Sequence, residues 1–402
     1  MNDVYKRNLM NKQPLDMEDS HTKKLLYFTV IDIEEKGFAG VAKKVLGQVE
    51  AFEELGYDVQ LLCFASSQLA MLHHDEKTVY EHFSVCCFHR RIQLCYHLSD
   101  LCCQEHFDIV YIRYPQCDWW FYRNLAKLRP SVEKVIIEIP TYPYDGENKH
   151  NHNFMTTLCV WQDKHFRKKI HQYVDLIVTY GNVHEKKIFG IPYCVICNGI
   201  SGNVLLQQYP NYKKHDTLNI IAVANLMYHH RYDKVLRGMA KYLSMPDSNK
   251  QIRFHLIGDG PEKKNLMDLT DKLNIKEYVI FHGAKTGQDL IDIYSIADLG
   301  LVGFSSVIPN TTIYCNSSLK FSEYCAVGLP HAGAGRHQEY PENNHFFIIP
   351  DITESEINIQ QLVDFVLNVN LSKAKNEMLD VLKRKLTWKT IMSQVLERLA
   401  VC

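Results

Sequence analysis

Short apolar segments alternate along the chain with longer stretches of helical periodicity. The first series of apolar segments is typical of buried strands, at Leu25–Ile31, Asp58–Phe64, Asp108–Tyr114, Lys134–Pro140, Asp175–Tyr180 and Tyr193–Asn198. The second series comprises Leu218–Leu226, Ile252–Gly258, Tyr278–Gly283, Leu299–Phe304, Pro330–Ala334 and Phe346–Pro350. Continuous apolar strands separated by helices indicate parallel sheets that helices cover on both faces. The pattern therefore predicts an α/β protein with two doubly wound parallel-sheet domains.

The order of these segments also predicts the domain boundaries. Residues 1–22 are polar and lack periodicity, so we expect a disordered tail. Residues 23–202 form the first predicted domain and residues 203–386 the second, because the chain turns polar soon after Ser201. Residues 387–402 carry apolar side chains at helical spacing and predict a C-terminal helix that packs back towards the first domain. Two such domains facing each other leave a crevice at the carboxyl ends of their strands, where open α/β sheets bind ligands.

Composition narrows the class of protein. The chain has 402 residues, 46% of them hydrophobic and 23% charged, as in soluble globular proteins of two domains. Its net charge of −1 provides no overall attraction to nucleic acid. Thirteen cysteines without an apolar leader indicate a reduced, cytoplasmic environment. No apolar run approaches the ~20 residues that span a bilayer, so any membrane association would be peripheral, on the inner face of the cytoplasmic membrane.

One short segment combines helix boundaries with charge. Ser318 is a suitable N-cap, Gly328 a helix terminator, and Pro330 prevents the helix from continuing. Lys320 lies in the first turn, where the helix dipole disfavours a cation unless an anion lies ahead of the helix. Glu323 follows one turn later and could accept hydrogen bonds from a ribose diol. In the alternative interpretation, Glu323 only complements the dipole and Lys320 extends to solvent.

The same segment, SLKFSEYCAVGLP, resembles the C-terminal signature of retaining GT-B glycosyltransferases of the GT4, or "group 1", family. Further similar segments are FHLIGDGPEKKNL, YVIFHGAKTGQDLIDIYSIADLGLVGF and ICNGI. ANLMYHHRYDKVLRGMAKY and EIPTYPYDGE resemble the branch of the family that builds capsular or exopolysaccharides. The resemblance extends over residues 23–400, and its more specific motifs lie in the C-terminal half.

The resemblance implies both a fold and a reaction. The fold would be GT-B, with two Rossmann-like domains: acceptor binding in residues 23–202 and nucleotide-sugar binding in residues 203–386. The reaction would transfer a hexosyl unit from a UDP- or GDP-sugar, with retention and without a metal or other cofactor. The acceptor would be a growing glycan or a lipid-linked sugar in surface polysaccharide biosynthesis.

The family pattern also assigns catalytic residues. Glu323 matches the second glutamate of the family's E-x7-E pair, and Lys320 matches a basic residue of one branch. Cys315 stands where the first glutamate is expected, and a thiol is a poor substitute for a carboxylate. Ala224-Asn225-Leu226 replaces a Gly-Arg-Leu motif, so Arg231 becomes the candidate for the missing phosphate-binding arginine; alternatively it is a surface residue. Nearby polar side chains could hold the sugar in place of the first glutamate: Thr311, Thr312, Tyr314, Asn316 and Ser317.

The nucleotide-sugar site is expected to use backbone as well as side chains. In the first domain, Gly37 and Gly40 flank a turn after a predicted strand, which is either a phosphate-contacting loop or only a tight turn. The complete set of predicted donor-binding residues is Gly37, Gly40, Asn225, Gly258, Gly283, Ser317, Ser318, Leu319, Lys320 and Glu323.

Acceptor binding is predicted in the loop that follows the strand ending near Glu138. Two prolines stiffen this loop, and Tyr142, Tyr144 and Asp145 are the candidate acceptor-binding residues. Asp145 could equally serve only to cap the turn. The histidines form no recognisable ligand set, so no metal site is predicted.

Two other kinds of protein remain open from the sequence. Cys315 and the absent arginine are compatible with a degenerate GT-B protein that acts as a partner or chaperone subunit of an active transferase. A GT-B epimerase or phosphorylase is less well supported, because neither additional acid–base carboxylates nor a pyridoxal-bearing lysine motif is evident.

Overall fold

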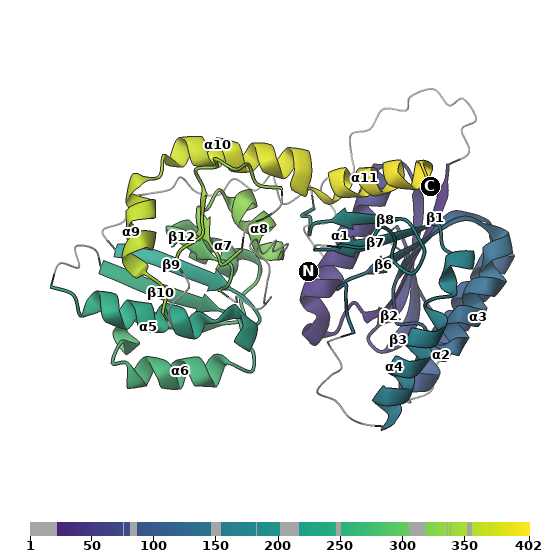
Figure 1. The fold of residues 1–402 in the computed structure, drawn as a ribbon, viewed down its shortest axis with the longest axis horizontal. Helices are drawn as coiled ribbons and strands as arrows, with labels where there is room; N and C mark the ends of the chain where they lie inside the picture. Colours follow the sequence, from purple (N-terminus) through teal and green to yellow (C-terminus); the bar gives the residue numbers. More distant parts are fainter. Residues whose placement is uncertain are drawn as a thin grey trace.

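The computed structural model describes residues 22–74, 76–80, 87–145, 154–181, 183–201, 217–246, 251–304, 318–335, 337, 339–351 and 356–402. They form two lobes that lie side by side, with the last two helices running across the top (Figure 1). Each lobe is a sheet flanked by helices.

The N-terminal lobe contains an eight-stranded sheet in the order β4-β3-β2-β1-β5-β6-β7-β8. Its strands are β1 (Lys24–Asp32), β2 (Asp58–Ala65), β3 (Gln68–His73), β4 (Glu76–Val79), β5 (Phe107–Arg113), β6 (Val132–Ile139), β7 (Leu176–Tyr180) and β8 (Tyr193–Ile196). Its helices are α1 (Ala39–Glu54), α2 (Cys87–Gln104), α3 (Trp119–Leu128) and α4 (Phe154–Phe166). Leu25 and Tyr27 of β1 pack on the same side as α1, whereas Leu26 and Phe28 pack with α2 and α3. Because both faces are covered, the central strands are mostly apolar.

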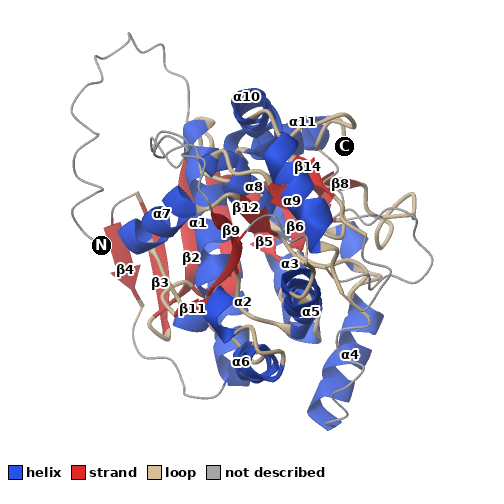
Figure 2. Cartoon of the chain, turned by 90° about the vertical axis from the view of Figure 1, so that its left-hand side faces the viewer, coloured by secondary structure: helices blue, strands red, loops and turns tan. Residues whose placement is uncertain are grey.

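The C-terminal lobe contains a six-stranded parallel sheet in the order β11-β10-β9-β12-β13-β14. Its strands are β9 (Thr217–Val223), β10 (Gln251–Ile257), β11 (Val279–Gly283), β12 (Leu299–Leu301), β13 (His331–Ala332) and β14 (Phe347–Ile348). Its helices are α5 (Tyr232–Leu243), α6 (Lys263–Lys272), α7 (Gly287–Ile296), α8 (Leu319–Val327), α9 (Ile359–Asn368) and α10 (Leu371–Val381). Helices α5, α6 and α9 share one apolar cluster, and α7, α8 and α10 belong to another, so the two groups cover opposite faces (Figure 2).

The predicted fold class is confirmed: every apolar segment predicted as a strand contains one. Several strands end earlier than predicted; Leu299–Phe304, for example, pairs only over Leu299–Leu301. The sequence interpretation missed the antiparallel hairpin of β3 and β4. This hairpin forms the outer edge of its sheet, and all four residues of β4 are exposed, so the buried apolar run that marks the other strands is absent there.

Two crossings of the chain connect the lobes. The Ile200 N–H donates to Leu386 O at 2.8 Å, and the Trp388 N–H donates to Ile200 O at 3.0 Å. Helix α11 (Trp388–Ala400) then packs against α1, as expected for its amphipathic pattern. The Trp388 ring touches Gly47 and Gly199 so closely that a Cβ there would lie 2.5 and 2.7 Å from it. The predicted boundary at 202 and 203 and almost all of the predicted tail, 1–22, lie outside the described residues.

None of the helices in the described part of the chain is long and apolar enough to cross a bilayer.

Candidate active site

Helix α8 lies between β12 and β13 and turns one polar edge towards the other lobe. Ser318 occupies the N-cap position with extended backbone, and Gly328 ends the helix with φ 67°, as predicted. Within the described residues the Ser318 hydroxyl makes no capping hydrogen bond. Phe321 and Tyr324 are buried, and the Tyr324 hydroxyl donates to Leu301 O at 3.1 Å. These contacts fix the helix in place. Its first turn contains Lys320 and no acidic residue.

Lys320 contacts a histidine from the loop between β9 and α5. Its Nζ lies 3.0 Å from His230 Nε2. The His230 ring stacks on Tyr232, with ring centroids 5.3 Å apart, and its Nδ1 faces the Met227 N–H at 3.3 Å. A neutral imidazole accepts at only one nitrogen, yet both nitrogens of His230 face an N–H donor. His230 therefore offers the Lys320 ammonium, which has three donors, at most one neutral acceptor, and an anion at this position would supply a charged one.

Burial changes the charge behaviour of both side chains. It lowers the pKa of Lys320 to about 8, although the nearby Glu323 carboxylate acts in the opposite direction. It lowers the pKa of His230 to about 3, with a further contribution from Lys320. At neutral pH, Lys320 is therefore charged and His230 is neutral, so this pair carries one positive charge at the start of α8.

Glu323 makes a contact between the lobes. Its Oε1 accepts a hydrogen bond from Lys43 Nζ of α1 at 2.6 Å, and the carboxylate is 23% exposed. A small cavity lies beside this pair, lined by Lys43, Lys44 and Ser201 on one side and by Leu319 and Glu323 on the other. The carboxylate predicted to contact a ribose therefore lies in the cleft, where Lys43 holds it.

Three of the predicted donor-binding residues meet at one edge of the C-terminal sheet. The Gly258 N–H donates to Gly283 O at 2.8 Å, and the neighbouring loop containing Asn225 is fixed by the Leu226 N–H, which donates to Asp259 O at 2.8 Å. Gly258 has φ 130°, and a Cβ there would lie 1.8 Å from Ala224 O. This close approach of the loops after β9, β10 and β11 requires glycine at that position.

The Arg231 side chain is directed at Asp233 rather than at Lys320. It adopts a left-handed backbone conformation, with φ 53°, at the start of α5. Its guanidinium is paired with both carboxylate oxygens of Asp233, at 3.0 and 3.1 Å, and lies over the Tyr228 ring. In this loop it is His230, not Arg231, that contacts Lys320. A phosphate-binding role for Arg231 would require it to leave Asp233.

The glycine-rich turn of the N-terminal lobe lies at the start of α1. Gly37 is in a short 3-10 turn, and Gly40 is in the first turn of the helix. Neither has a positive φ. Around Gly40 no described atom lies within 4 Å of where a Cβ would be, so the structure itself does not require glycine there. The open space is compatible with a ligand, and the predicted role remains a prediction.

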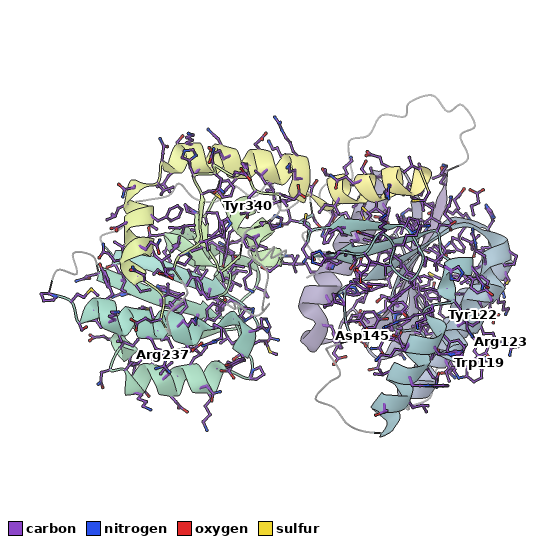
Figure 3. All side chains as sticks on the ribbon, viewed as in Figure 1. Trp119, Tyr122, Arg123, Asp145, Arg237 and Tyr340 are labelled. Carbon is purple, nitrogen blue, oxygen red and sulfur yellow. The ribbon has the colours of Figure 1, made fainter. Side chains whose placement is uncertain are left out.

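The candidate acceptor-binding residues, Tyr142, Tyr144 and Asp145, form hydrogen bonds that anchor the loop after β6 within the N-terminal lobe. The Tyr142 hydroxyl donates to Glu185 Oε1 at 3.3 Å, and the Tyr144 hydroxyl donates to Asp163 Oδ2 at 2.8 Å. Both oxygens of Asp145 accept from the Arg167 guanidinium, at 2.9 and 3.0 Å. Asp145 lies on the side of the N-terminal lobe nearer the other lobe (Figure 3). These side chains are engaged within the lobe, so any contact with an acceptor would be an additional one.

The sequence interpretation missed a buried ionic cluster beneath α1. The Glu138 carboxylate accepts from Gln48 Nε2 at 2.8 Å and from the Tyr111 hydroxyl at 2.7 Å, and it pairs with Arg113. Lys44 Nζ lies 3.5 Å from Glu138 Oε1 and 3.4 Å from the centre of the Tyr180 ring. Burial raises the pKa of Glu138, but Lys44 and Arg113 outweigh it and keep the pKa below its usual value.

Part of the signal was nevertheless present in the sequence. Glu138 follows the apolar run of residues 135–137 inside β6, and Lys44 faces the sheet from an amphipathic helix; a charge in such a position requires a partner.

Several predicted residues cannot be located. Ser317 and Cys315, together with the alternative sugar-binding residues Thr311, Thr312, Tyr314 and Asn316, lie outside the described residues.

Two lobes of α/β structure, with polar side chains of both meeting beside a small cavity, are typical of proteins that bind ligands between domains. Residues 207–330, which include α8 and the preceding strand β12, match the family model described as "Glycosyl transferases group 1". No curated protein matches the chain by sequence.

Solved structures similar to this chain include sucrose-phosphate synthase from Thermosynechococcus elongatus, with TM-score 0.64 and 13% identity, covering 94% of this chain and 99% of that one. WaaG, a glycosyltransferase involved in lipopolysaccharide biosynthesis, is similar at TM-score 0.60 and 12% identity over 92% and 98% of the two chains. Anabaena HepE in complex with UDP-glucose is similar at TM-score 0.56 and 12% identity over 94% and 100%. The protein therefore has the GT-B fold, and the family match supports glycosyltransferase function.

Proposed function

We propose that this protein transfers a hexosyl unit from a nucleotide-diphosphate sugar to a glycan or lipid-linked acceptor, with retention of anomeric configuration. One observation carries the proposal. Within the segment that matches the family model, α8 presents Lys320 and Glu323 at the cleft, and Glu323 meets α1 of the opposite lobe through Lys43.

The proposed chemistry needs charge rather than a metal ion or cofactor. A departing nucleoside diphosphate develops negative charge, and the α8 N-terminus offers about half a positive charge to stabilise it. Lys320 adds a positive charge, and its His230 partner is neutral and offers at most one acceptor. Preorganised groups of this kind usually supply the largest part of catalysis. Glu323 would bind the ribose once the nucleotide displaces Lys43, and closure of the cleft would exclude water.

The acceptor is proposed from similarity of fold and motif. WaaG acts in lipopolysaccharide biosynthesis and HepE was solved with UDP-glucose. We infer a UDP- or GDP-sugar donor and a surface-polysaccharide acceptor at the cytoplasmic face of the membrane, reached in the lobe that carries Tyr142, Tyr144 and Asp145.

A panel of UDP-, GDP- and ADP-sugars tests this proposal. The correct donor at 100 times its Kd should stabilise the folded protein by about 2.7 kcal/mol, visible as a rise in Tm. The same donor should be hydrolysed slowly alone and transferred to acceptor glycans extracted from the source cell. If a sugar nucleotide stabilises the protein but is neither hydrolysed nor transferred, the protein is a binding protein and the proposed enzymatic activity is contradicted. If no sugar nucleotide of the panel stabilises the protein, the proposed nucleotide-sugar site is contradicted.

Donor binding should weaken in alkali. The ammonium fraction of Lys320 falls as pH rises through about 8, whereas His230 stays neutral throughout. Nucleotide-sugar affinity, measured by titration calorimetry, should therefore be about tenfold lower at pH 9 than at pH 7. Lys320→Arg keeps its charge over this range and should show a flatter profile. Equal slopes for the two proteins would contradict the assignment of Lys320 to the diphosphate.

A basic and aromatic face formed by α4 and the residues just after it supports peripheral membrane attachment. One open surface hollow is lined by Trp161, Lys164, His165, Lys168 and Lys169. Trp161 is 62% exposed, and its ring stacks on His165. Trp119, whose backbone N–H donates to Gln162 Oε1 at 3.3 Å, lies near Arg123 on the side of this lobe away from the other lobe (Figure 3). Exposed tryptophan among lysines is typical of surfaces that bind anionic headgroups.

Removing two of these lysines should weaken vesicle binding. Each basic residue near an anionic surface contributes about 1 kcal/mol, so Lys168→Ala with Lys169→Ala should lower affinity about 30-fold. Cosedimentation with phosphatidylglycerol–phosphatidylcholine vesicles measures this. Lys272→Ala with Lys276→Ala on the C-terminal lobe is the matched control. Equal loss in both double variants would show only a general charge effect and contradict the α4 surface.

A further inference from the structure

Two consecutive histidines and an aspartate meet at the outer part of the N-terminal sheet, far from the cleft. His73 is the last residue of β3, and Asp58 is the first residue of β2. Gln60 pairs directly with His73, so Asp58, two residues before Gln60, points to the same face of the sheet as His73. Accordingly, His73 Nε2 lies 2.6 Å from Asp58 Oδ1.

The next histidine joins them because the backbone turns. In a continued strand, His74 would point to the opposite face. Instead His74 has φ 51°, in the left-handed region that non-glycine residues rarely adopt. Its ring centroid lies 4.3 Å from that of His73, and its Nε2 lies 3.5 Å from the same Asp58 Oδ1. An unfavourable backbone conformation thus brings a second imidazole to one carboxylate.

The three ligand atoms have the separations of a metal site. They all lie within 4.8 Å of one another. A tetrahedral ion with bonds of 2.0–2.2 Å places its ligand atoms roughly 3.3 Å apart, so only small side-chain rotations are needed. Glu53, at the end of α1, places Oε1 3.9 Å from His74 Nδ1. This is an ion-pair distance rather than a hydrogen bond, and a small rotation of Glu53 would give the carboxylate–imidazole hydrogen bond that orients histidine ligands in zinc sites.

We propose that Asp58, His73 and His74 bind a divalent transition-metal ion such as Zn²⁺, with water as the fourth ligand and Glu53 orienting His74. The ion fastens the β3–β4 hairpin to the start of β2. It is separate from the sugar chemistry: Glu53 and Lys43 are ten residues apart on α1, or about 15 Å along the helix. With His74 64% and His73 39% exposed, an ion can enter from solvent.

The test is a Zn²⁺ titration of the full chain, without a histidine tag, against a chromophoric chelator. Asp58→Asn and His73→Ala should each weaken binding at least tenfold, and Glu53→Gln by about 10- to 100-fold. His106→Ala, in a surface group with Asp108 and Glu133, is the matched control and should leave the affinity unchanged. Mg²⁺ should not compete, because it prefers oxygen ligands. Zn²⁺ should raise the Tm of the wild type but not of His73→Ala.

Two kinds of result would overturn the site. One is a failure of the two histidines to matter: the His73→Ala, His74→Ala double variant binds Zn²⁺ as tightly as the wild type does, or the wild type does not bind Zn²⁺ at all. The other is binding through the exposed thiols of Cys103 and Cys402. Co²⁺, added in place of Zn²⁺, shows an intense charge-transfer absorption when thiolates bind it. If the thiols hold the metal, this band appears with the wild type and disappears with the Cys103→Ser, Cys402→Ser variant. The proposed site predicts no such band in either protein.

Discussion

Lys320→Ala should lower kcat by on the order of 10²–10³, the cost of removing one preorganised donor from a developing oxyanion. The expectation rests on the position of Lys320 in the first turn of α8, where its described hydrogen-bond partner His230 is neutral and cannot balance its charge. Steady-state kinetics with the donor identified by the panel measures the loss. The donor-induced rise in Tm should also largely disappear.

A lysine elsewhere on the same lobe provides the control. Lys276 is exposed and paired only loosely with Asp271, at 3.3 Å, so Lys276→Ala should change kcat less than twofold. If Lys320→Ala folds with the wild-type circular dichroism spectrum and keeps more than a third of kcat, Lys320 does not stabilise the leaving group.

Glu138→Gln should destabilise the protein by about 3–5 kcal/mol, the usual cost of removing one partner from a buried ion pair. Glu138 is fully buried, and the substitution leaves Arg113 and Lys44 without their shared carboxylate. Urea unfolding, with circular dichroism as the probe, gives the free energy of unfolding.

The same strand supplies a matched comparison. Glu133 of β6 is 63% exposed, and Glu133→Gln should change stability by less than about 0.5 kcal/mol. Adding Lys44→Met to Glu138→Gln removes one of the unpaired cations and should recover part of the loss. A Glu138→Gln variant as stable as Glu133→Gln would mean that the cluster is not a dominant stabilising feature.

The sequence predicts the fold well because parallel strands covered on both faces leave continuous apolar runs. It does not predict β3 and β4, because at this edge of the sheet all four residues of β4 are exposed and no buried apolar run marks the strand. It predicts Lys320 and Glu323 as a local helical pair, but not their partners. His230 is 90 residues from Lys320, and Lys43 is 280 residues from Glu323. Contacts of that separation depend on how loops and lobes pack, and no local pattern encodes them.

The Asp58, His73 and His74 cluster illustrates the same limit. From the sequence, two consecutive histidines at the end of a strand are expected to point to opposite faces of the sheet. Only the positive φ at His74 brings their rings together. Arg231 shows the converse. Its place in the loop before α5 was predicted from sequence, but the direction of its side chain is decided by Asp233, two residues later.

The most direct test of the central claim is a crystal structure with the nucleoside diphosphate that stabilises the protein most. The account predicts the diphosphate at the N-terminus of α8, within hydrogen-bonding distance of Lys320 Nζ, with Glu323 released from Lys43 and bound to the ribose. A diphosphate bound elsewhere, with Lys320 still directed at His230 and Glu323 still held by Lys43, would contradict it.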